Sequence, residues 1–160
     1  MNKSIDQWLS EYGKSHQNPT NKKIHWICVP LILTSLFGLL WNLSFPINIT
    51  ISLNDMLISM NWTLTLIIIA TLFYFKLSLS LTIGMIFISM GALTINHYLN
   101  LLPYPLWQTS LFIFVIAWIG QFIGHKIEGK KPSFFKDIQF LLIGPAWLLS
   151  FIYKKLNIPL

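Results

Sequence analysis

Residues 62–102 read WTLTLIIIATLFYFKLSLSLTIGMIFISMGALTINHYLNLL, and Lys76 is the only acidic or basic residue among them apart from one histidine. A single membrane crossing takes about 20 predominantly apolar residues, so this stretch is about twice as long as one span needs. It predicts a helical hairpin in the membrane, with Lys76 at the turn and its ammonium group reaching the headgroups. Pro103 and Pro105 then end the second helix, because each proline lacks a backbone donor.

The composition of the chain also indicates a membrane protein. Of its 160 residues 54% are hydrophobic and only 10% are charged, and the mean hydropathy is +0.63. A soluble globule needs more polar surface than this. The eleven basic residues are all lysines, give a net charge of +6 and flank the apolar segments. This placement favours membrane lipid with anionic headgroups as a partner and argues against nucleic acid.

Three further apolar segments surround the hairpin. A first span is expected from about Thr20 to Leu43, and another covers about Leu106 to Gly124. The last segment, Asp137 to Tyr153, is broken by Gly144-Pro145 and predicts a kinked span or a re-entrant helix pair, of which the re-entrant form is preferred. Segment 44–61 is polar and lacks lysine, so we expect a loop with an interfacial turn.

The N-terminal residues predict a short helix of a different kind. Apolar residues recur there at helical spacing among polar ones, at Ile5, Trp8, Leu9 and Tyr12. This pattern is typical of an amphipathic helix that lies on a membrane surface, and it ends near Gly13. Asn18 and Pro19 suit the start of the next helix. We therefore expect an all-α, membrane-embedded bundle of about four spans, forming a single domain over residues 1–160.

Lysine placement predicts the orientation of these spans. Nine lysines lie at one set of ends: Lys3, Lys14, Lys22, Lys23, Lys76, Lys126, Lys130, Lys131 and Lys136. Because lysine is enriched in cytoplasmic loops, these ends and the N-terminus are predicted to be cytoplasmic.

On this map His16, His25 and His125 share the cytoplasmic face. Neutral imidazole is the commonest protein metal ligand, and ionisable groups at membrane depth are by default functional. One histidine near an interface would more often contact a headgroup, but three on one face favour a joint metal site. His97, the fourth histidine, is a further candidate ligand. The map nevertheless places it a helix length from the others.

Polar residues near these histidines complete the candidate site. Gln121 lies one turn before His125 on the same side of the helix, and Glu128 follows at the i+3 position. We take Glu128 as a candidate catalytic acid, although it could instead pair with Lys22 or Lys131. Candidate substrate-binding residues are Asn21, Gln121 and Lys126. Asn21 could equally serve only in the first turn of its helix, and Lys126 only in setting topology.

Two blocks of the chain resemble a known family. They are HQNPTNKKIH at residues 16–25, with Tyr12 before it and Val29-Pro30 after it, and AWIGQFIGHKIEGKKP at residues 117–132. These blocks look like the signatures of the small membrane 2-hydroxy fatty acid dioxygenases of fatty-acid α-oxidation. The similarity extends over nearly the whole chain. It implies a bacterial member located in the inner membrane.

The resemblance implies an iron(II) site built from histidines, with His16, His25 and His125 in the matching positions. Many family members place the acid one residue further from the second-block histidine than Glu128 stands here. The implied reaction shortens a long-chain 2-hydroxy fatty acid by one carbon with O2. Because the substrate supplies the electrons, no reductase is required, which agrees with a chain that has no Gly-rich nucleotide loop.

Other functions remain to be compared. Membrane di-iron hydroxylases and desaturases need many more histidines, in patterns that this sequence lacks. A haem b protein with His25 and His125 as axial ligands stays open. So does a lipid-binding membrane protein that catalyses no reaction.

Overall fold

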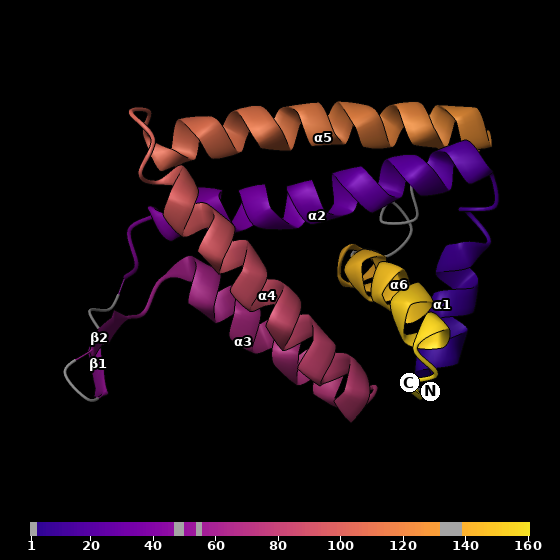
Figure 1. Ribbon diagram of the computed structural model, residues 1–160, viewed down its shortest axis with the longest axis horizontal. Coiled ribbons are helices and arrows are strands. Elements are labelled where there is room, and N and C mark those ends of the chain that lie inside the picture. The colour runs from indigo at the N-terminus through magenta and orange to yellow at the C-terminus, as the bar shows by residue number, and fades with distance from the viewer. Residues whose placement is uncertain (1–2, 47–49, 54–55, 132–138) are drawn as a thin grey trace.

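A computed structural model describes residues 3–46, 50–53, 56–131 and 139–160 (Figure 1). Helices dominate these residues: α1 (Ile5–Gly13), α2 (Pro19–Trp41), α3 (Trp62–Phe75), α4 (Leu79–Leu99), α5 (Leu106–Glu128) and α6 (Phe140–Lys155). Lys136, Asp137 and the end of the second signature block, Pro132, lie outside the described residues.

The long apolar helices agree with the predicted spans. Helices α2, α4 and α5 are long and apolar enough to cross a membrane, whereas α3 is apolar but has only 14 residues. The predicted hairpin is confirmed, because Lys76 caps the end of α3 and α4 begins at Leu79. Asn18 caps α2 with its side chain and Pro19 follows, as expected. Of the about four spans expected, three helices among the described residues qualify by length and composition, and α3 is a shorter apolar helix.

Helices α2 and α5 lie side by side and run antiparallel, so the N-terminal end of α2 meets the C-terminal end of α5 (Figure 1). Two glycines of α5 allow this close approach. A side chain at Gly120 would collide with Cys28 Sγ, and one at Gly124 would collide with Asn21 Oδ1. Small residues bring membrane helices together in this way. The contact places His25 and His125 at the same end of the bundle.

The α3–α4 hairpin crosses the other end of α2 and then slants toward α6 (Figure 1). At the crossing, Asn96 Nδ2 donates to the carbonyl oxygen of Thr34 at 2.8 Å. At the far end, Tyr74 donates to the Leu142 carbonyl and Tyr153 to the Ser80 carbonyl, both at 2.7 Å. These hydrogen bonds therefore tie the α3–α4 hairpin to α2 at one end and to α6 at the other.

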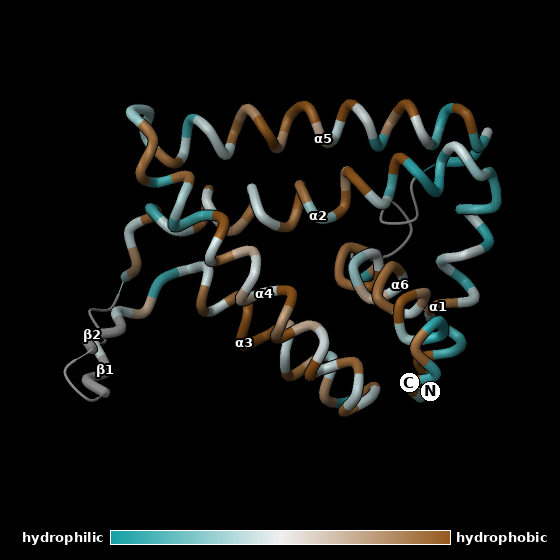
Figure 2. The backbone as a smooth tube through the Cα atoms, in the orientation of Figure 1, coloured by the Kyte–Doolittle hydropathy of each residue, from teal (hydrophilic) through white to brown (hydrophobic). Residues whose placement is uncertain are grey.

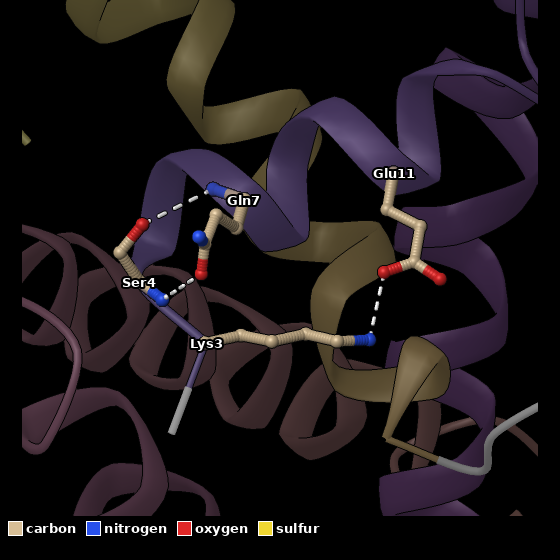
Figure 3. Close-up of polar contacts among 4 residues, drawn as sticks. All are labelled: Lys3, Ser4, Gln7 and Glu11. Atoms are coloured by element: carbon tan, nitrogen blue, oxygen red, sulfur yellow. Dashed lines mark hydrogen bonds and ion pairs between the residues drawn. The ribbon is translucent and has the colours of Figure 1, made fainter. Parts of the chain in front are cut away.

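The helix predicted near the N-terminus forms as α1, but its apolar side faces protein. Ile5, Trp8 and Tyr12 are buried against α6, and the Trp8 ring meets Phe140 edge to face at 5.3 Å. Figure 3 shows how the start of α1 is fixed: Ser4 and Gln7 form a capping box, and Lys3 pairs with Glu11 at 2.7 Å. The expected amphipathic helix is therefore present, and its apolar face packs on aromatic residues of α6.

Two expectations need correction. Helix α6 is continuous through Gly144-Pro145, so these residues do not divide it into a helix pair. Proline removes one donor near the start of the helix, and the preceding glycine has no Cβ to collide with the ring. Segment 44–61 is not only a loop: β1 (Thr50–Leu53) pairs antiparallel with β2 (Met56–Ser59). Apolar and polar residues alternate in β1, which suits a strand.

Candidate metal centre

Hydrophilic residues gather where α1, the start of α2 and the end of α5 meet (Figure 2). His16 lies there in the linker between α1 and α2, and its side chain is completely buried. Its ring stacks on Tyr12 at 4.1 Å and lies 5.2 Å from the Trp147 ring. Loss of hydration lowers the pKa of His16 to about 4, so the imidazole is neutral at pH 7.

Backbone carbonyl groups fix the tautomers of two histidines. His16 Nδ1 lies 2.7 Å from the carbonyl oxygen of Tyr12, and His25 Nδ1 lies 2.9 Å from that of Asn21. A carbonyl oxygen can only accept a hydrogen bond, so each Nδ1 carries the proton. Each Nε2 therefore presents a lone pair. This is the second-shell arrangement that commonly orients metal-binding histidines.

The two lone pairs point at each other. His16 Nε2 and His25 Nε2 are only 2.9 Å apart, and both rings are buried. Two acceptors at this distance repel unless a cation lies between them. A metal ion bound to both nitrogens would remove this repulsion.

His125 completes the cluster from α5. Its ring centroid lies 5.0 Å from those of both His16 and His25, and one ligand atom from each of the three side chains lies within 4.8 Å of the others. The side chain is buried, and its Nδ1 makes no hydrogen bond in the structure. Three segments that are distant in sequence thus direct imidazole rings into one buried place. These donors fit a transition metal such as iron.

The same spacing does not suit a haem. Axial histidines must lie on opposite faces of a flat macrocycle, with the iron between them. The 2.9 Å separation of His16 Nε2 and His25 Nε2, with His125 against both rings, leaves no room for such a plane.

The predicted catalytic acid lies at the edge of the cluster. Glu128 accepts hydrogen bonds from the backbone N–H groups of Gln17 and Asn18 at 2.8 and 2.9 Å, and from Asn21 Nδ2 at 3.0 Å. Among the described residues, the only ion pair joins Lys3 and Glu11. Glu128 therefore pairs with neither Lys22 nor Lys131. The carboxylate joins the end of α5 to the start of α2.

The predicted substrate-binding residues have different surroundings. Asn21 is completely buried and its amide is engaged by Glu128. Gln121 is buried one turn before His125. Lys126 is exposed and lines an open depression of about 400 Å³ that also reaches His125 and Phe122. The structure therefore brings Lys126 and His125 to one surface.

His97 is not brought to the cluster. It is exposed on α4, and the neighbouring residue Asn96 contacts the Thr34 carbonyl. Thr34 follows His25 by nine positions, which is about 13 Å along the helix.

Trp147 was missed by sequence reasoning. It lies against His16 only because α1 and α6 pack together, and no local pattern signals such a contact.

Comparisons with known proteins agree with the resemblance seen in the sequence. A family model described as 2-hydroxy-palmitic acid dioxygenase Mpo1-like matches residues 2–156. The 2-hydroxy-palmitic acid dioxygenase MPO1 of Saccharomyces cerevisiae is 28% identical over 151 residues, covering 91% of this chain and 78% of the yeast protein. No solved structure gives a significant match. The chain belongs to the 2-hydroxy-palmitic acid dioxygenase Mpo1-like family.

Proposed function

We propose that the protein is an iron(II)-dependent dioxygenase that shortens long-chain 2-hydroxy fatty acids by one carbon. Its metal ligands in this proposal are His16, His25 and His125. The observation that carries the proposal is their buried cluster, in which two Nε2 lone pairs face each other at 2.9 Å. Family membership supports the class of reaction, because the yeast relative is a 2-hydroxy-palmitic acid dioxygenase. We leave His97 out because it is exposed far along α4.

The reaction balances without another reductant. A 2-hydroxy acid, R–CH(OH)–COOH, and O2 give R–COOH, CO2 and H2O. The carbon that carries the hydroxyl is oxidised to a carboxylic acid, the bond to the original carboxyl carbon breaks, and that carbon leaves as CO2. Iron(II) at the three imidazoles supplies a centre for activating O2 beside a chelating hydroxyl and carboxylate. The substrate donates all the electrons, so no reductase partner is needed.

The protein's own side chains would bind and orient the substrate. Lys126 lies in the depression beside His125, where its positive charge would attract the carboxylate. Gln121 is buried one turn before His125, and we propose that its amide hydrogen-bonds the polar head. The Asn21 side chain hydrogen-bonds Glu128, and its backbone carbonyl oxygen hydrogen-bonds His25. We therefore propose that Asn21 orients His25. The acyl tail would remain among the apolar helices.

We further propose that the site faces the cytoplasm from a bacterial inner membrane. Lys14, Lys22, Lys23, Lys126, Lys130 and Lys131 surround the end of the bundle that carries the histidine cluster. Lysines are enriched on the cytoplasmic side of membrane proteins.

Selectivity for the 2-hydroxyl group tests this function. Purified protein would be loaded with iron(II) without oxygen, mixed with 2-hydroxypalmitate and then exposed to air. We expect mass spectrometry to detect the acid with one carbon fewer. Palmitate, which lacks the 2-hydroxyl group, should remain unchanged. Iron-loaded protein that leaves 2-hydroxy acids of all chain lengths intact would refute the proposal and would favour an electron-transfer or sensing role.

A further inference from the structure

The C-terminal end of α5 and the turn after it form hydrogen bonds with the linker that carries His16, at two positions. Glu128 accepts the backbone N–H groups of Gln17 and Asn18, which directly follow His16. Lys130 Nζ donates to the carbonyl oxygen of Lys14 at 2.6 Å, two residues before His16. We call Glu128 and Lys130 the linker clamp. His16 lies between the two hydrogen-bonded positions of the linker.

The location of Glu128 is unfavourable for its own helix. A carboxylate in the last turn of a helix meets the negative end of the helix dipole. The Glu128 carboxylate lies at the start of α2, where it accepts backbone N–H groups. It also lies near the positive end of the α2 helix dipole. Asn21 Nδ2 adds a third hydrogen bond at 3.0 Å. The acid therefore stabilises the contact between α5 and the linker rather than α5 alone.

Gly129 turns the chain so that both clamp residues reach the linker. It has a φ of 70°, a left-handed conformation that glycine adopts without strain. Its N–H donates to the Lys126 carbonyl, and the Lys130 N–H donates to the His125 carbonyl at 3.3 Å. This pattern is a Schellman motif. The turn thus links the clamp directly to the backbone of His125.

We propose that the linker clamp is a positioning device for the metal centre, an inference that rests on the proposed function. His25 and His125 stand on helices, whereas His16 lies in a non-helical linker and needs other contacts to hold it. The clamp attaches that linker to the helix that carries His125. Glu128 and Lys130 are positioning residues in this account, since their charged groups bind the linker backbone. This revises the expectation that Glu128 is a catalytic acid.

Iron(II) affinity tests the clamp. We expect Glu128→Ala to weaken binding about 10- to 100-fold, as loss of outer-shell partners commonly does. Glu128→Gln, which keeps one accepting oxygen, should give a smaller loss, and so should Lys130→Met. Glu11→Gln is the matched control, because Glu11 is an acid on α1 whose exposed carboxylate pairs with Lys3 instead of the linker. Affinity would be measured by competition with a coloured chelator.

Amide hydrogen exchange in iron-free protein gives a readout that is independent of activity. In Glu128→Ala we expect faster exchange at Gln17 and Asn18, with unchanged exchange in parts of α2 and α5 distant from the linker, for example at Phe37 and Ala117. Equal acceleration along both helices would show a general stabilising role and would overturn the clamp. Wild-type affinity retained in Glu128→Ala would also overturn it. Wild-type protein that binds no iron would instead refute the proposed function.

Discussion

Two backbone carbonyl groups determine what His16 and His25 can bind. The carbonyl oxygens of Tyr12 and Asn21 accept hydrogen bonds from His16 Nδ1–H and His25 Nδ1–H, which leaves a lone pair on each Nε2. Tyr12 also stacks on the His16 ring, so one residue fixes both the tautomer and the plane of that imidazole. Each ring can therefore offer an electron pair to a metal ion.

Removing any one ligand should abolish the metal site. We expect His16→Ala, His25→Ala and His125→Ala each to lose bound iron while still inserting into the membrane, because the remaining two imidazoles hold the ion too weakly. His97→Ala is the matched control, since this histidine is exposed on α4 and should leave iron content unchanged. Metal analysis of the four purified variants makes the comparison. Full iron occupancy in the first three would show that the ligands are elsewhere.

The histidine ligands could be proposed from sequence, but their supporting contacts could not. His16 and His25 lie in one short motif, and the lysine pattern places His125 on the same face. Trp147 reaches His16 through the packing of α6 on α1, and Glu128 reaches the linker across more than a hundred residues. Such contacts depend on tertiary packing that no local pattern records.

At the level of secondary structure elements, the contact between α2 and α5 sets the width of the site. Gly120 and Gly124 lie one turn apart on α5 and face Cys28 and Asn21 of α2. Any side chain at these positions would push the helices apart and with them His25 and His125.

Gly124→Ala should therefore be destabilising. We expect a loss of about 1–3 kcal/mol in the free energy of unfolding, because the new methyl group would collide with Asn21 Oδ1. Gly91→Ala on α4 is the control, since nothing lies within 4 Å of the position that its Cβ would occupy. It should be neutral or stabilising by up to about 1 kcal/mol, owing to the higher helix propensity of alanine. Denaturation in detergent measures both, and equal stability of the two variants would contradict the close-packing account.

The elements that consist of long apolar runs were predictable. Those whose conformation depends on packing against other elements were not. The helix expected for the first span, the hairpin with its turn at Lys76 and the helix that carries His125 all form as expected. Helix α6 was expected to break because proline weakens helices locally, but packing on α1 and on the α3–α4 hairpin keeps it continuous. The strands β1 and β2 were missed because each has only four residues.

At the scale of the whole molecule, the histidine cluster lies among hydrophilic residues at one end of the α2–α5 pair (Figure 2). The opposite ends of these helices lead into the β1–β2 hairpin and the turn before α5 (Figure 1). If α2 and α5 cross the bilayer, these two ends lie on opposite sides of it.

Cysteine labelling tests that arrangement. In a Cys28→Ser background, cysteines at positions 3 and 130 should react only with reagent from the cytoplasmic side, whereas one at position 44, just after α2, should react only from outside. Lysine-rich ends favour the cytoplasm, which gives the expected direction. Reaction of positions 3 and 130 from opposite sides would be incompatible with one site that contains both His16 and His125.

The central claim is that three histidines hold iron for a reaction in which the 2-hydroxy acid is the only reductant. Its most direct measurement is the stoichiometry of a single reaction mixture that contains iron-loaded protein, O2 and 2-hydroxypalmitate labelled with carbon-13 in the carboxyl group. We expect one O2 to be consumed and one labelled CO2 to be released for each fifteen-carbon acid formed, with no added reductant. Dependence on an added reductant, or oxygen consumption with the label retained in the fatty acid, would contradict it.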